Sequence, residues 1–187
     1  MKFLIYTILY LCLCCTLQAK SSSACIVGTG LAYHEGNLEM GYSMPMHIGW
    51  MHGLGKYKRL SMLHQFQGGS YRPVLITDIA DQYYRQSIWR SCIQYHFIQK
   101  NWITGYFGGG LFAAYVRGLI GTGAYHATTN QSSYFYHLRA GVSVHAGIQF
   151  QLTPSAFSID CKPLVFDYGY ARYVQGAALI SLIYHIK

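Results

Sequence analysis

Residues 136–152 read YHLRAGVSVHAGIQFQL, and apolar side chains alternate with polar or small ones through the whole stretch. The even positions, from Tyr136 to Leu152, form one face, and the odd positions, from His137 to Gln151, form the other. A period of two is the signature of a β-strand whose two faces meet different surroundings. These seventeen residues exceed the roughly 9–11 that a tilted strand needs to cross a bilayer. The stretch predicts a long strand, apolar on one side and polar on the other.

Other segments show the same alternation, some of them weakly. They are residues 26–34, 38–50 (broken by Pro45), 58–67, 89–97, 102–116, 157–162 and 178–186. The connections between strands are short at 99–101 and 153–154, and long at 68–85, 118–133 and 163–174. Short links at one end and long ones at the other are typical of barrels in a bacterial outer membrane. We therefore predict an all-β fold, a closed antiparallel up-and-down transmembrane β-barrel of about eight strands.

Composition agrees with this prediction. Charged residues make up 11% of the chain, against about 25% in ordinary soluble domains. Aromatic residues make up 16%, including 18 tyrosines, and there are 20 glycines. A membrane barrel turns about half its side chains toward lipid and carries aromatic girdles at both rims, which produces this composition.

A soluble, lipocalin-like barrel with a ligand inside is the alternative, because alternation alone does not say which face points outward. The polar faces carry mainly Gly, Ser, Gln and His. The exterior of a soluble protein is expected to be dense in Lys and Glu instead. The polar faces therefore favour the membrane barrel, with its polar side inward.

The N-terminus has the pattern of a secretory signal. Lys2 is followed by an apolar run from Phe3 to Leu17. The small residue Ala19 fits cleavage in part, since Leu17 is larger than signal peptidase prefers, and a site nearer Ala24 is the alternative. We expect a signal peptide over residues 1–19 and a single barrel domain over residues 20–187. A lipidated Cys25 is the alternative, since Ser22-Ser23-Ala24 precedes it. The net charge of +8 would suit nucleic acid, but secretion removes the chain from nucleic acid, and none is expected as a partner.

The segment FSIDCKP at residues 157–163 resembles the Ser-Leu-Asp-Trp-Lys-Pro signature of the small outer-membrane β-barrel domain (porin-family) proteins of Gram-negative bacteria. The preceding Gly147-Ile148-Gln149-Phe150 and the closing segment 180–186 fit the same pattern. Two departures stand out: Cys161 replaces the aromatic residue, and Ile186-Lys187 replaces a terminal Phe.

This resemblance implies a location in the cell outer membrane. It implies contact with outer-membrane lipid and lipopolysaccharide, insertion by the barrel-insertion machinery, and an extracellular partner whose identity the sequence leaves open. The function it implies is non-enzymatic: a structural, surface-interaction or small-solute role.

Polar side chains of the last three predicted strands should point into the lumen. They are Arg139, Asp160 and Lys162, with His137, His185 and Gln149. A barrel of eight strands is just wide enough for side chains to fill it, so inward polar groups must satisfy one another. We therefore predict a lumen polar network that acts as a structural plug.

Two predicted outer connections are rich in residues that suit recognition surfaces. The candidate contacts are Tyr125, His126, Tyr168, Tyr170 and Arg172. Tyrosine provides a large, rigid contact area at low entropic cost. The same residues equally suit an aromatic girdle at the level of the lipid headgroups.

An enzymatic alternative rests on Ser143 and His145. Some barrel enzymes of this size remove or transfer acyl chains of lipid A. The deacylase type carries a His-x-Ser pairing with an adjacent Asn, in which the His activates the Ser hydroxyl. Here the order is reversed, and no acid is placed to orient the base. No spacing predicts a metal site, and no cofactor is expected. We predict no catalytic residue.

Overall fold

The computed structural model describes residues 23–36, 40–54, 59–73, 83–121, 132–152 and 156–186. The predicted signal peptide and its cleavage site lie outside these ranges. Within them, no helix is both long and apolar enough to cross a bilayer.

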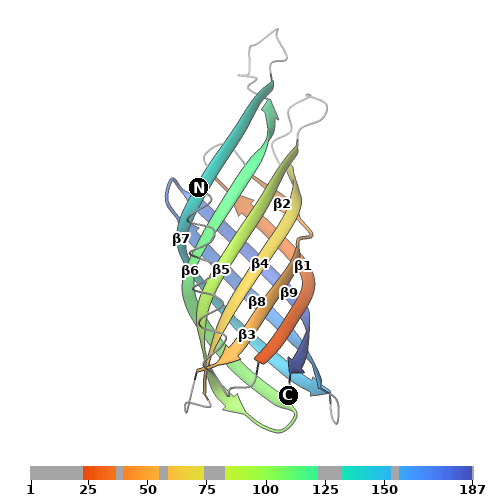
Figure 1. Ribbon diagram of the computed structural model, residues 1–187. Helices are drawn as coiled ribbons and strands as arrows, with labels where there is room; N and C mark the ends of the chain where they lie inside the picture. The colour runs from red at the N-terminus through yellow and green to blue at the C-terminus, as the bar shows by residue number, and fades with distance from the viewer. Residues whose placement is uncertain are drawn as a thin grey trace.

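One antiparallel sheet closes on itself to form a tilted barrel (Figure 1). Its strands are β1 (Ser23–Glu35), β2 (Met40–Ser43), β3 (Met46–Gly53), β4 (Leu60–Pro73), β5 (Tyr83–Gln99), β6 (Ile103–Gly121), β7 (Ser132–Leu152), β8 (Phe157–Gly169) and β9 (Tyr173–Ile186). Strands that follow one another from β3 to β9 are hydrogen-bonded neighbours, and β9 pairs with β1 along its whole length. The predicted closed, antiparallel, up-and-down barrel is confirmed.

Strands β2 and β3 together occupy one position in the barrel. Both pair with β1 and with β4, in one continuous register: Ala32 pairs with Ser43 and Thr29 with Met46. The interruption falls at Met44 and Pro45, because proline has no N–H to give to the ladder. The Thr29 hydroxyl donates to the Pro45 carbonyl at 2.9 Å and so bridges the break. The nine strands thus fill eight barrel positions, and the predicted break at Pro45 is confirmed.

The predicted long connection at 163–174 is wrong. Strand β8 continues through Pro163 to Gly169, and the chain turns only at residues 170–172, where Ala171 and Arg172 have positive φ angles of 57° and 59°. The register of β8 against β9 shifts between Lys162 and Val165. This bulge accommodates the proline, since a bulged residue makes no ladder hydrogen bond. The bulge also breaks the period of two, so the second half of the strand reads as a loop.

The two faces of the sheet settle its orientation. Apolar side chains point outward along every strand, as Leu138 shows with 77% of its surface exposed. Most Gln, His and Ser side chains point into the lumen and are buried there, together with the charged side chains of Arg90, Arg139, Asp160, Lys162 and Asp167. A lipocalin-like barrel requires the opposite arrangement, so the structure contradicts the soluble alternative. The polar interior and apolar exterior are those of a barrel built for a membrane.

Candidate functional site: a filled lumen

A buried ion pair crosses the middle of the lumen. Arg90 of β5 donates from Nε to both oxygens of Asp167 on β8, at 3.0 and 3.1 Å, and from a terminal nitrogen at 2.5 Å. Its other terminal nitrogen donates to Gln67 Oε1 at 2.7 Å. Arg90 and Asp167 are 1% and 0% exposed. A carboxylate buried this deeply needs its cation and hydrogen bonds to offset the cost of leaving water.

An aromatic layer lies next to this pair, toward the Glu35 end of β1. The rings of Tyr71 and Tyr84 stack with centroids 5.0 Å apart, and His34 Nδ1 lies 3.3 Å from the Tyr84 hydroxyl. The ring of Tyr173 packs 4.8 Å from that of His34 and 5.0 Å from that of Phe112. All five residues are buried and come from five strands. Rings from β1, β4, β5, β6 and β9 therefore pack against one another inside the lumen.

Hydrogen bonds hold the aromatic layer in place. The Tyr173 hydroxyl accepts from the Gln86 amide and donates to Gln175 Oε1 at 2.8 Å. Both glutamines are buried in the lumen. A buried phenol is stable only with such partners, because an unpaired hydroxyl in a low-dielectric interior loses its water without compensation.

On the opposite side of the central pair, the lumen holds smaller polar clusters. Asp160 Oδ2 lies 3.3 Å from Lys162 Nζ, and Asp160 Oδ1 accepts from the Tyr106 hydroxyl at 2.6 Å. The Gln94 amide donates to His145 Nε2 at 3.0 Å, and Ser61 donates to Gln94 at 3.1 Å. Many polar groups thus pair with one another within the barrel, which is how a narrow barrel fills its interior.

The six residues predicted to form one polar network fall into separate places. Asp160 and Lys162 form an ion pair, and Gln149 Nε2 lies 3.1 Å from His185 Nε2. Arg139 is ten positions along β7 from Gln149, the residue that pairs with Asp160. Ten strand residues span about 33 Å, so the register puts Arg139 in the opposite half of the barrel from Asp160. His137 lies two residues farther along, with its ring 5.4 Å from that of Phe135.

Sequence reasoning missed the central pair. Asp167 lies beyond the bulge of β8, in the segment that the alternation predicts to be a connection, so its inward orientation does not follow from the pattern. Carrying the period of two onward from Val165 places Val165, Asp167 and Gly169 on the lumen side, as the structure has them. The bulge at Pro163 was the signal that would have allowed this correction.

Ser143 and His145 do not form a nucleophile and base. Both are buried on the lumen side of β7, and His145 Nε2 is hydrogen-bonded to Gln94. The acyl chains of a membrane lipid lie outside the barrel, so neither side chain can meet such a substrate. Within the described ranges, no three His, Cys, Asp or Glu side chains gather as a metal site.

The five residues predicted as surface contacts lie in different parts of the structure. Tyr170 is 82% exposed in the β8–β9 turn, next to Ala171 and Arg172. Tyr168 is an outward-facing strand residue, so it is not part of a loop. Tyr125 and His126 lie outside the described residues.

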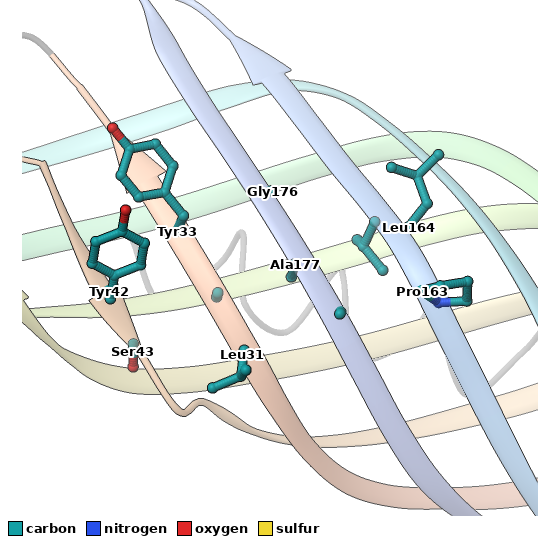
Figure 2. Close-up of a pocket in the computed structure, with 11 residues that line it drawn as sticks. Leu31, Tyr33, Tyr42, Ser43, Pro163, Leu164, Gly176 and Ala177 are labelled. Carbon is teal, nitrogen blue, oxygen red and sulfur yellow. The ribbon is translucent and has the colours of Figure 1, made fainter.

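An apolar groove of about 450 Å³ lies on the outer surface where β8, β9, β1 and β2 run side by side. Figure 2 shows Leu31, Tyr33 and Tyr42 on one side of it and Pro163 and Leu164 on the other. The groove coincides with the break between β2 and β3 and with the bulge in β8. It lies outside the lumen, so it offers no route through the barrel.

Neither a protein-family model nor a curated protein matches the chain. Several solved structures are similar to it. Ail, the attachment invasion locus protein of Yersinia pestis, is 11% identical with a TM-score of 0.60, and the match covers 90% of this chain and 100% of that chain. Neisserial surface protein A is 12% identical with a TM-score of 0.62, covering 89% and 97%. The N-terminal β-barrel domain of Pseudomonas aeruginosa OprF is 14% identical with a TM-score of 0.54, covering 88% and 97%. The chain has the fold of the small outer-membrane β-barrel proteins.

Proposed function

We propose that the protein is a non-enzymatic barrel of the Gram-negative outer membrane that acts through its outer end, and that its lumen conducts no solute. One observation carries the proposal. The Arg90–Asp167 pair, with Gln67 beside it and the Tyr71–Tyr84 stack next to it, occupies the cross-section that a solute would have to cross. A side chain held by several hydrogen bonds at once cannot step aside without losing all of them together.

The two ends of the barrel differ, which supports a role for one of them. At one end the connections are short, as at residues 100–102 between β5 and β6. At the other end β6 and β7, of 19 and 21 residues, extend past most of the other strands (Figure 1). The chain joining them covers residues 122–131, and residues 74–82 join β4 to β5. In outer-membrane barrels the longer connections face the outside of the cell.

The names of similar structures agree with a surface role. One similar barrel is an attachment invasion locus protein, and another is a surface protein. A further structure of the first holds the heparin analogue sucrose octasulfate. We propose the same general role, contact with molecules at the cell surface, for this chain. Its partner is set by the outer connections and the outer rim.

Two measurements test the proposal. Membrane fractionation followed by a gel of boiled and unboiled sample should find the chain in the outer membrane, with the unboiled form migrating faster. In planar bilayers, the folded protein should give no steady single-channel current. A steady current from the folded form would contradict the closed lumen and show that solutes pass through it. A protein recovered in the soluble fraction, with no mobility shift, would overturn the membrane placement itself.

A further inference from the structure

Three arginines point outward at the outer end of neighbouring strands. Arg85 of β5 pairs directly with Arg117 of β6, and Arg72 of β4 follows Tyr71, which pairs with Tyr84. All three arginines are exposed on the outer face. Neighbouring strands therefore present three guanidinium groups side by side on the surface that faces the membrane.

These arginines mark the edge of the apolar surface. On β6, the outward positions from Phe107 to Tyr115 carry no charge, and Arg117 is the first charged residue beyond them. Arg117 lies ten positions beyond Phe107 and at a tilt of 45° this separation is a rise of about 23 Å along the barrel axis, close to the apolar band of about 25 Å. On β5, Arg85 lies twelve residues from the outward-facing Phe97. The guanidinium groups therefore sit at the depth of lipid headgroups.

The register puts like charges against each other. Directly opposed like charges on neighbouring strands are destabilising unless an anion lies between them. Among the carboxylates of the described residues, Asp160 and Asp167 are in the lumen, and Glu35 lies on β1 with the Tyr33 hydroxyl 3.5 Å away. Within the part of the chain that the structure describes, no carboxylate neutralises the Arg85–Arg117 pair.

A small polar cleft lies between the two arginines. It measures about 140 Å³ and is lined by Tyr83, Arg85, Arg117, Gly118 and Tyr134. The Arg85 guanidinium carbon lies 5.8 Å from the centroid of the Tyr83 ring. Guanidinium groups bind phosphate through bidentate hydrogen bonds. Tyrosines at this position are typical of the aromatic girdle that outer-membrane barrels carry at the level of the lipid headgroups.

We propose that this cleft binds a phosphate group of the lipopolysaccharide headgroup in the outer leaflet, with Arg72 as a neighbouring cation. The proposal rests on the outer-membrane placement proposed above. A lipid is favoured over a soluble polyanion because the cations point sideways at the edge of the apolar band, where a headgroup lies and where soluble glycans are excluded by packed lipid.

Native mass spectrometry of the folded protein in detergent tests the site. The probes are lipid A with both phosphates, lipid A without phosphate, inorganic phosphate and a soluble polysulfated sugar. The test variant is Arg85→Gln/Arg117→Gln. The control is Arg59→Gln/Lys100→Gln, which removes two exposed cations from the opposite end of the barrel. The mobility of unboiled protein verifies folding of each sample and separates failure of the barrel from failure of the site.

Wild-type protein should bind phosphorylated lipid A at least about tenfold more tightly than the phosphate-free form, as expected for charge-assisted hydrogen bonds. The Arg85→Gln/Arg117→Gln variant should lose this preference, and the control variant should keep it. Equal binding of the two lipids by a folded wild type would overturn the proposal, as would a preference that survives in the test variant. The site could instead bind the soluble polysulfated sugar or inorganic phosphate more tightly than lipid A, and lose that binding in the Arg85→Gln/Arg117→Gln variant. This result would contradict a lipid ligand and identify the ligand as a soluble anion.

Discussion

Arg90 and Asp167 are joined across the lumen although β5 and β8 are not neighbours in the sheet. The side chains come from strands separated by β6 and β7, so the curvature of the barrel brings them together. The pair is fully buried and makes three hydrogen bonds, with a fourth from Arg90 to Gln67. Its energetics can be tested with substitutions at either end.

Asp167→Asn should destabilise the folded barrel by about 3–5 kcal/mol, because it leaves the Arg90 guanidinium buried without its counter-charge. The measurement is the free energy of unfolding in urea for protein folded into vesicles. The double variant Arg90→Met/Asp167→Asn removes both charges and should recover much of this loss. Arg90→Met alone is the second single variant. A double variant that loses as much stability as Asp167→Asn and Arg90→Met added together would contradict the coupling.

Tyr173→Phe should cost about 1–3 kcal/mol, since it leaves polar atoms of Gln86 and Gln175 buried without their phenol partner. Tyr170→Phe is the matched control, because that side chain is 82% exposed in the turn that precedes β9. It should leave the urea midpoint unchanged. Equal effects at the two positions would show that the hydroxyl of Tyr173 does not hold the aromatic layer.

Gly110→Ala should destabilise the barrel or prevent its assembly. A Cβ at this position would lie 2.6 Å from the Cα of Cys92 and still closer to the Ser91 carbonyl oxygen, and both atoms belong to the neighbouring backbone. Overpacking of this kind costs about 1–3 kcal/mol or more. A Cβ at Gly176 would meet no atom within 4 Å, so Gly176→Ala should fold normally. The yield of heat-modifiable protein measures both variants.

Val142→Arg should destabilise the protein by about 2–4 kcal/mol, since Val142 lies outward near the middle of β7, where an arginine would enter the centre of the bilayer. Tyr134→Arg, near the outer end of the same strand, should cost about 0–1 kcal/mol. Unfolding of vesicle-embedded protein measures the difference. Two small and equal costs would mean that this face of the barrel is not in contact with lipid.

The sequence predicts the fold well where alternation is unbroken. Strand β7 keeps one apolar face over residues 136–152 and β9 over residues 178–186, so their orientation follows from the pattern alone. In β5 the apolar face is readable over residues 89–97, and Arg85 and Ser87 interrupt it nearer the other end. The break at Pro45 is also readable, because proline cannot donate to a ladder. The second half of β8 is not predicted, because the bulge at Pro163 and Leu164 shifts the phase of the pattern.

The candidate site is less predictable from the sequence. Alternation gives the face of the sheet on which a side chain lies, but not its position along the barrel axis. Arg139 and Asp160 share the lumen side, but the stagger between strands sets their distance, and no local pattern encodes that stagger. The pairing of Gln149 with Asp160 fixes it and separates Arg139 by ten residues. Predicting Asp167 as the partner of Arg90 requires both this stagger and the phase shift at the bulge of β8.

The Arg90–Asp167 contact also constrains the order of assembly. On an open, flat sheet the two side chains would be three strand spacings apart, about 14 Å. They meet only after the sheet has curled, so a partly assembled chain carries both charges unpaired. Curling of the β5–β8 segment and neutralisation of this pair are therefore the same event. A chain that inserts before its strands have curled must carry two bare charges into the bilayer.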